Sequence, residues 1–204
     1  RTRFEDTANN LAASVASGQL AIAQWQREMQ RALGAYTRQM AVAGAGKQVP
    51  AQTQITIDAK LKTQWPFLRG FATQILARQM GDDSEDFPAR PMSEQWIAAR
   101  SRKYGGTGWG AYFVGQGSVA EPGVVDVWLT RDDPFVCPVC APRHQVYFLP
   151  GVGPYPGWDC LGDCRCERVP ELIPDVYADL RGLRSSQIHS INREKLKRKK
   201  RVAA

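Results

Sequence analysis

The sequence predicts a mainly α-helical protein with a small C-terminal α+β lobe that binds zinc. Apolar residues recur at helical spacing through the first half of the chain, whereas all five cysteines and seven of the thirteen prolines lie between residues 131 and 170. The length of 204 residues suits one domain with a small appendage. We therefore expect a helical domain over residues 1–121, a zinc-binding Cys-rich lobe over 122–183 and a basic tail over 184–204.

Four long amphipathic segments predict the helices of the first domain. Their ranges are residues 4–17, 20–43, 55–80 and 94–104. Asp6 or Thr7 is the expected cap of the first helix, and Gly18 its end. Pro66 should kink or split the third helix, because proline lacks the amide donor and crowds the preceding turn. Ser93 is the expected N-cap of the fourth helix.

The character of the sequence changes after the fourth helix. Glycines at positions 105, 106, 108 and 110 weaken the helical signal, so the continuation of the helix there is uncertain. Residues 124–130 are rich in β-branched side chains and predict a strand. Regular structure should be sparse between residues 131 and 170, and a short helix is expected over residues 171–183.

Positive charge is concentrated at the C-terminal end. The chain has a formal net charge of +7, and residues 193–204 supply +6 of it, from seven basic residues and one acid. Such a run is either a solvated end or a phosphate-binding arm, and an arm would bind DNA or RNA without sequence preference. The residues of the predicted nucleic-acid contact are Lys195, Lys197, Arg198, Lys199, Lys200 and Arg201.

Several function classes find little support in the sequence. No apolar stretch approaches the roughly 20 residues that span a bilayer, and no secretory signal precedes the first helix, so we expect a soluble protein made inside the cell. The glycines at 105–110 follow a helix and lack the Lys-Ser/Thr of a phosphate loop. No Gly-x-Ser-x-Gly elbow is present, and we expect no enzymatic activity.

The cysteine cluster predicts the zinc site. Cys137 and Cys140 form a C-x2-C knuckle, and Cys160, Cys164 and Cys166 follow after a Pro/Gly-rich loop. This pattern is typical of tetrahedral zinc with thiolate ligands, whose binding would order a segment that has few apolar residues. Four ligands saturate such a site, so the choice among the five cysteines stays open. His144 is a weaker candidate.

Three other interpretations of the cysteines remain open. A redox pair would open a helix after a strand, and disulfides would suit a secreted protein with an even cysteine count. A catalytic zinc would keep an open position beside a general base. The carboxylates near the cluster are Asp132, Asp133, Asp159 and Asp163. A closed structural site accounts best for the pattern.

The order of these residues resembles the C-terminal signature of the phage head-morphogenesis family, the Mu F-like minor head proteins. The similar features are Trp128-Leu129-Thr130 with Asp133, the Cys137-Pro138-Val139-Cys140 knuckle, and a Pro/Gly loop closing on Cys164-Arg165-Cys166. Gly18-Gln19-Leu20 with Trp25, and Ala99-Arg100 with Tyr104, are compatible with the helical half of that family. Where the family tends to have a histidine before Pro-x-Cys-Arg-Cys, this chain has Trp158-Asp159-Cys160, and Cys160 is the expected replacement ligand.

The resemblance implies a structural minor capsid protein of a tailed bacteriophage or prophage. Such a protein would assemble in the bacterial host cytoplasm into the virion head, against the portal or major capsid protein and near packaged DNA. An alternative is a zinc-ribbon protein whose ribbon itself binds nucleic acid, although only Arg143, Arg165 and Arg168 are basic between residues 132 and 180. A zinc-dependent hydrolase is a further alternative.

Overall fold

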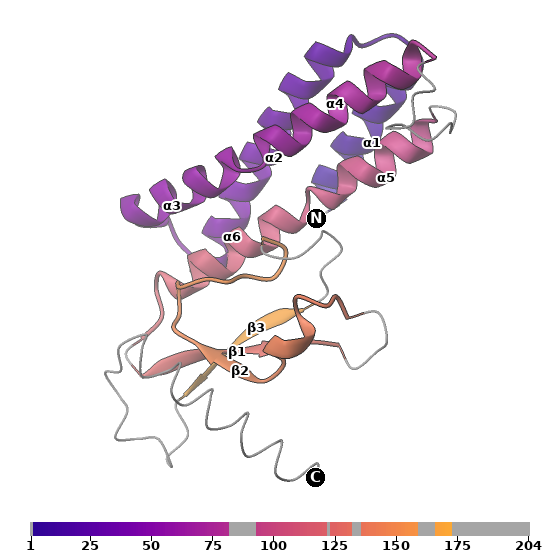
Figure 1. The fold of residues 1–204 in the computed structure, drawn as a ribbon. Helices are drawn as coiled ribbons and strands as arrows, with labels where there is room; N and C mark the ends of the chain where they lie inside the picture. Colours follow the sequence, from indigo (N-terminus) through magenta and orange to yellow (C-terminus); the bar gives the residue numbers. More distant parts are fainter. Residues whose placement is uncertain (1, 82–92, 122, 132–135, 159–165, 173–204) are drawn as a thin grey trace, which may run out of the picture.

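The computed structural model describes residues 2–81, 93–121, 123–131, 136–158 and 166–172. Within these ranges the protein is mainly helical, with one small antiparallel sheet (Figure 1). The helices are α1 (Thr2–Ala16), α2 (Ile22–Ala45), α3 (Ala51–Lys62), α4 (Trp65–Gln79), α5 (Glu94–Lys103) and α6 (Gly106–Gly117). The strands are β1 (Val124–Leu129), β2 (Val146–Phe148) and β3 (Glu167–Leu172), with a short 3-10 helix, η1 (Ala141–Arg143), before β2. The predicted mainly α fold with a small sheet is confirmed at this level.

Most of the predicted helix-capping residues lie at the observed helix ends. Gly18 follows α1 with φ +74°, and Gly46 ends α2 with φ +64°, a left-handed conformation that glycine adopts without a steric penalty. The backbone N–H of Trp96 donates to Ser93 Oγ over 3.1 Å, which confirms the predicted cap of α5. The predicted cap of the first helix is wrong, because α1 already begins at Thr2.

The predicted third helix is two helices. Pro66 lies in the first turn of α4, where its missing N–H removes no helical hydrogen bond, and α3 ends just before it at Lys62. The chain therefore splits at this proline, as one of the two expected outcomes. The predicted start of this helix at residue 55 is wrong, since α3 begins at Ala51 directly after Pro50.

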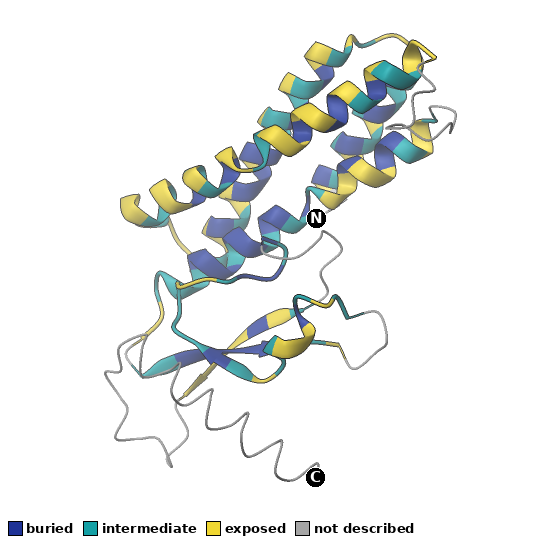
Figure 2. Cartoon of the chain, in the orientation of Figure 1, coloured by how far each residue is buried: buried dark blue, intermediate teal, exposed yellow. Residues whose placement is uncertain are grey.

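A single hydrophobic core fills the space between the helices. Trp25 of α2 and Trp96 of α5 each pack edge-on against Phe71 of α4, with ring centroids 5.4 and 5.1 Å apart. Figure 2 shows buried positions along the inward sides of the helices and exposed positions on the outward sides. Tyr155 and Trp158, from the segment between β2 and β3, belong to the same core cluster. The cysteine-bearing part of the chain thus packs against the bundle through aromatic side chains.

The glycine-rich stretch forms helix α6, contrary to the weak helical signal of the sequence. A Cβ added at Gly115 would lie 2.0 Å from the carbonyl oxygen of Ala41, and one at Gly108 would lie 2.2 Å from the ring of Tyr36. Both neighbours belong to α2. Gly115 therefore allows α2 and α6 to pack backbone to backbone, and Gly108 leaves room for the Tyr36 ring.

The opposite side of α6 packs equally closely against residues 149–158, which we call the strap. A Cβ at Gly110 would lie 2.0 Å from the ring of Trp158, and one at Gly117 would lie 1.8 Å from the amide nitrogen of Gly151. Residues 106, 110 and 117 share one face at 3.6 residues per turn, while 108 and 115 share the opposite face. Tertiary contact on both faces overrides the low helix propensity of glycine.

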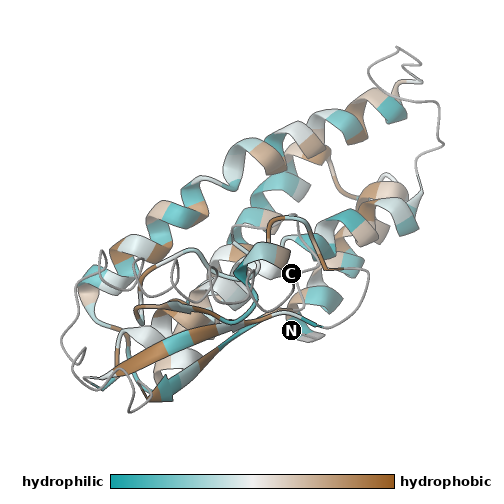
Figure 3. Ribbon diagram, turned by 60° about the horizontal axis from the view of Figure 1, so that its bottom comes forward, coloured by the Kyte–Doolittle hydropathy of each residue, from teal (hydrophilic) through white to brown (hydrophobic). Residues whose placement is uncertain are grey.

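The sheet has strand order β2-β1-β3, with both pairs antiparallel. In Figure 3 hydrophobic residues are prominent along the sheet, whereas the helices alternate between hydrophilic and hydrophobic positions. The expected strand over residues 124–130 is confirmed as β1. The helix expected over residues 171–183 is wrong at its start, since Glu171 and Leu172 extend β3, and residues 173–183 lie outside the described residues. No helix in the described ranges is long and apolar enough to cross a membrane.

Candidate metal centre

The strand register gathers the cysteine-bearing segments at one end of the sheet. Trp128, near the end of β1, pairs with Val146 at the start of β2, and Leu129 pairs with Glu167 at the start of β3. Cys166 directly precedes Glu167, and the knuckle and η1 directly precede β2. The antiparallel pairing therefore brings both segments to the C-terminal end of β1.

The knuckle itself is a tight turn. The backbone N–H groups of Cys140 and Ala141 both donate to the carbonyl of Cys137, over 2.9 and 3.0 Å. The turn places the two Sγ atoms 3.2 Å apart, with Cys140 buried. A disulfide would need about 2.05 Å. Two thiolates on one tetrahedral zinc, at a Zn–S length of about 2.3 Å, are roughly 3.8 Å apart. The donor pair thus fits one side of a zinc ion after a small opening of the turn.

His144, the weaker ligand candidate, lies against the end of β1. The backbone N–H of Thr130 donates to His144 Nδ1 over 3.2 Å, and Thr130 Oγ1 lies 2.9 Å from the same atom. Because an amide can only donate, Nδ1 is the acceptor, and the proton of the neutral ring then sits on Nε2. Neither nitrogen has a free lone pair for a metal in this arrangement. His144 instead ties the end of β1 to η1, which leaves the cysteines as the candidate ligands.

Cys160 and Cys164 lie outside the described residues, as do the carboxylates at 132, 133, 159 and 163 and the basic residues of the tail. Across the described ranges, no group of three or more His, Cys, Asp or Glu side chains is close enough to hold a metal. Among the described residues, the candidate ligands are therefore the two knuckle sulfurs, with Cys166 carried to the same end of the sheet by β3.

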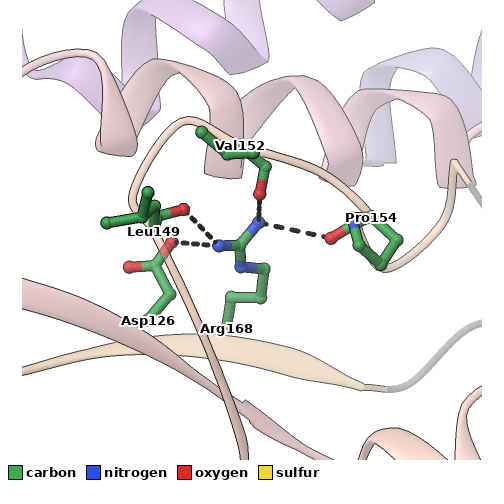
Figure 4. Close-up of polar contacts among 5 residues, drawn as sticks. All are labelled: Asp126, Leu149, Val152, Pro154 and Arg168. Carbon is green, nitrogen blue, oxygen red and sulfur yellow. Dashed lines mark hydrogen bonds and ion pairs between the residues drawn. The ribbon is translucent and has the colours of Figure 1, made fainter. Parts of the chain in front are cut away.

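A buried charge cluster lies on the neighbouring part of the sheet (Figure 4). Arg168 of β3 and Asp126 of β1 form an ion pair of 2.9 Å with side chains 0 % and 2 % exposed. Arg168 also donates to three carbonyls of the strap, those of Leu149, Val152 and Pro154, over 2.9, 2.8 and 3.2 Å. The guanidinium therefore fastens the strap onto the sheet.

Burial shifts the pKa values of both residues of this pair. Desolvation raises the pKa of Asp126 above 3.8, and the Arg168 charge offsets part of that rise. Desolvation likewise lowers the pKa of Arg168, against the opposing effects of Asp126 and Tyr155. Arg168 stacks near the rings of Tyr155 and Phe148, at 4.7 and 5.1 Å. All the partners of Arg168 among the described residues belong to the interior of the protein. Arg168 therefore stabilises the fold and is not exposed to bind a phosphate.

The sequence contains a signal for this pair, although no pairing of Asp126 with Arg168 was predicted from it. Asp126 interrupts an otherwise apolar strand, Val124-Val125-Asp126-Val127-Trp128. An acid at such a position is expected to have a buried cationic partner. Arg168 lies diagonally across from it, because Asp126 pairs with Pro170 and Trp128 with Arg168. Only the register, which the sequence does not give, identifies this arginine.

No family model, no curated protein and no solved structure matches this chain.

Proposed function

We propose that this chain is a structural minor head protein of a tailed bacteriophage or prophage, with a C-terminal lobe held by a structural zinc ion. The proposal combines the cysteine signature with the geometry of the sheet. The observation that carries it is the knuckle, whose sulfurs lie 3.2 Å apart at the sheet end where β3 brings Cys166. Zinc there would join the knuckle to the start of β3. The role of the protein is structural, not catalytic.

Zinc would be held by Cys137 and Cys140, together with Cys166 and either Cys160 or Cys164. When bound, the metal supplies cross-linking between segments that share few apolar contacts. The chain's own contribution is to position the knuckle with the backbone hydrogen bonds to Cys137. The test is elemental analysis of the purified full chain. One zinc per chain supports the site, and a metal-free, folded protein would reject it.

The head-protein role has a separate test. The protein should be found in purified particles of the phage or prophage that carries its gene, and should co-purify with portal or major capsid protein. Its absence from such particles would reject the role even if zinc were bound. Deletion of residues 193–204 tests the tail: DNA association and its salt dependence should fall, and unchanged binding would remove DNA from the partners.

The alternative of a nucleic-acid-binding ribbon is weakened by the geometry of its arginines. Arg168 is fully buried on internal partners, and the guanidinium of Arg143 lies 5.1 Å from the centre of the Trp128 ring. A ribbon that binds phosphates needs cations on its surface. Neither Arg143 nor Arg168 meets that requirement, whereas Arg131, at the edge of the lobe, is exposed.

A further inference from the structure

A cavity of about 600 Å³ opens on the helical side of the molecule, away from the cysteine knuckle. It lies between α4, α5, the start of α6 and the end of the strap, and we call it the α4–α5 groove. Its volume falls within the roughly 300–1,000 Å³ typical of ligand pockets. Aromatic side chains form much of its wall, namely Phe67, Trp96, Tyr104 and Trp158. Phe67 is 67 % exposed, an unusual position for so apolar a side chain.

The charged residues that line the groove are all basic. Arg100 and Lys103, one turn apart on α5, belong to the wall, and no carboxylate does among the residues that the structure describes. Neither cation has an ion-pair partner within the described ranges. The groove therefore favours an anionic occupant.

The aromatic residues are poorly arranged for nucleic-acid bases. Trp158 is only 9 % exposed and packs against Tyr155, and Trp96 is covered by the guanidinium of Arg78 at 3.8 Å. Stacking of successive bases requires open ring faces beside a basic track. Phe67 is the one groove aromatic in the described structure that is more than half exposed. An apolar anchor with flanking carboxylates fits this combination better than a nucleotide strand.

We propose that the α4–α5 groove binds an acidic peptide segment of another protein. One apolar side chain of the segment packs against Phe67 inside the groove, and carboxylates beside it pair with Arg100 and Lys103. Tyr104 also belongs to the wall, and burial raises its pKa to about 12. This inference does not depend on the metal site or on the head-protein role.

The test uses fluorescence anisotropy with the full-length chain. The probe is a labelled peptide with one tryptophan flanked on each side by two glutamates. We expect saturable binding with a Kd on the order of 10–100 μM, weakened several-fold as salt rises from about 0.05 to 0.3 M. The double variant Arg100→Gln/Lys103→Gln should weaken binding about tenfold or more. Phe67→Ser should weaken it about fivefold through the lost apolar contact.

Matched controls separate the groove from general surface charge. Lys62→Gln and Arg69→Gln each remove one exposed positive charge from outside the groove, and both should leave the Kd within about twofold. A peptide with lysines in place of the glutamates should not bind. The proposal is overturned if no binding saturates below about 1 mM, or if the control variants weaken binding as much as the groove variants. Tighter binding of a single-stranded oligonucleotide that depends on Arg100 and Lys103 would also overturn it.

Discussion

Replacement of Arg168 by methionine is the sharpest test of how the strap is held on the sheet. The change removes the 2.9 Å ion pair with Asp126 and the donors to three strap carbonyls. Loss of one partner of a buried ion pair costs about 3–5 kcal/mol, because the other charge is left uncompensated. We therefore expect Arg168→Met to lower the free energy of unfolding by about 4 kcal/mol. The measurement is urea unfolding followed by circular dichroism in zinc-containing buffer.

The pH dependence gives the same experiment a second readout. Without Arg168, only desolvation acts on Asp126, and its folded-state pKa moves further above 3.8. The folded state then binds more protons than the unfolded state, so stability falls as pH rises from about 4 through the folded-state pKa. The variant should be closest to the wild type in acid, and the difference should widen toward pH 7.

The double variant Asp126→Leu/Arg168→Met decides whether charge is the cause. Removing both charges leaves no unpaired ion, so about 2 kcal/mol of the single-variant loss should be recovered at pH 7. The reasoning is refuted if Arg168→Met costs less than about 1 kcal/mol, or if the double variant is no more stable than the single one.

Three further predictions follow from the helix packing and the knuckle. Gly115→Ala should lower the free energy of unfolding by about 2–3 kcal/mol in thermal or urea unfolding, because its Cβ would meet a backbone oxygen at 2.0 Å. The control Gly70→Ala, whose Cβ would have nothing within 4 Å, should raise it by about 0.5–1 kcal/mol. Equal effects of the two substitutions would contradict close packing at Gly115. His144→Gln should leave the zinc content of the purified chain unchanged, whereas Cys140→Ser should lower it; a metal-free His144→Gln protein would show that the histidine is a ligand. Treatment with a zinc chelator should speed hydrogen exchange in β2 and β3 while the amides of α2 stay protected, and identical exchange with and without chelator would count against a metal that holds the lobe.

The helices could be predicted from the sequence because each carries its own signals. Ser93 before the apolar stripe of α5, and Pro66 with its missing donor, act within one or two turns, and the structure follows both. The cysteine knuckle is equally local, since two cysteines three residues apart meet in any tight turn of this kind. Features of this sort need no knowledge of the tertiary fold.

Helix α6 and the Asp126–Arg168 pair could not be predicted in the same way. Gly115 and Gly110 lower the helix propensity of the segment. They favour helix α6 only because their missing side chains allow α2 and Trp158 to pack closely against it. Likewise, Arg168 is one of several arginines until the register of β1 with β3 places it diagonally across from Asp126. In both cases the cause is a contact between segments more than forty residues apart, which periodicity and propensity do not encode.

The same contacts determine how the two parts of the molecule are connected. Trp158, at the end of the strap, packs on Gly110 and donates from its Nε1 to the carbonyl of Thr107, while Arg168 holds the middle of the strap from the other side. The strap is therefore fixed between α6 and the sheet by one aromatic anchor and one buried cation. Trp158 also lines the α4–α5 groove, and Arg168 lies two residues after Cys166, so the strap connects the groove with the end of the sheet that carries the knuckle. A change that loosens Arg168 should consequently alter the groove.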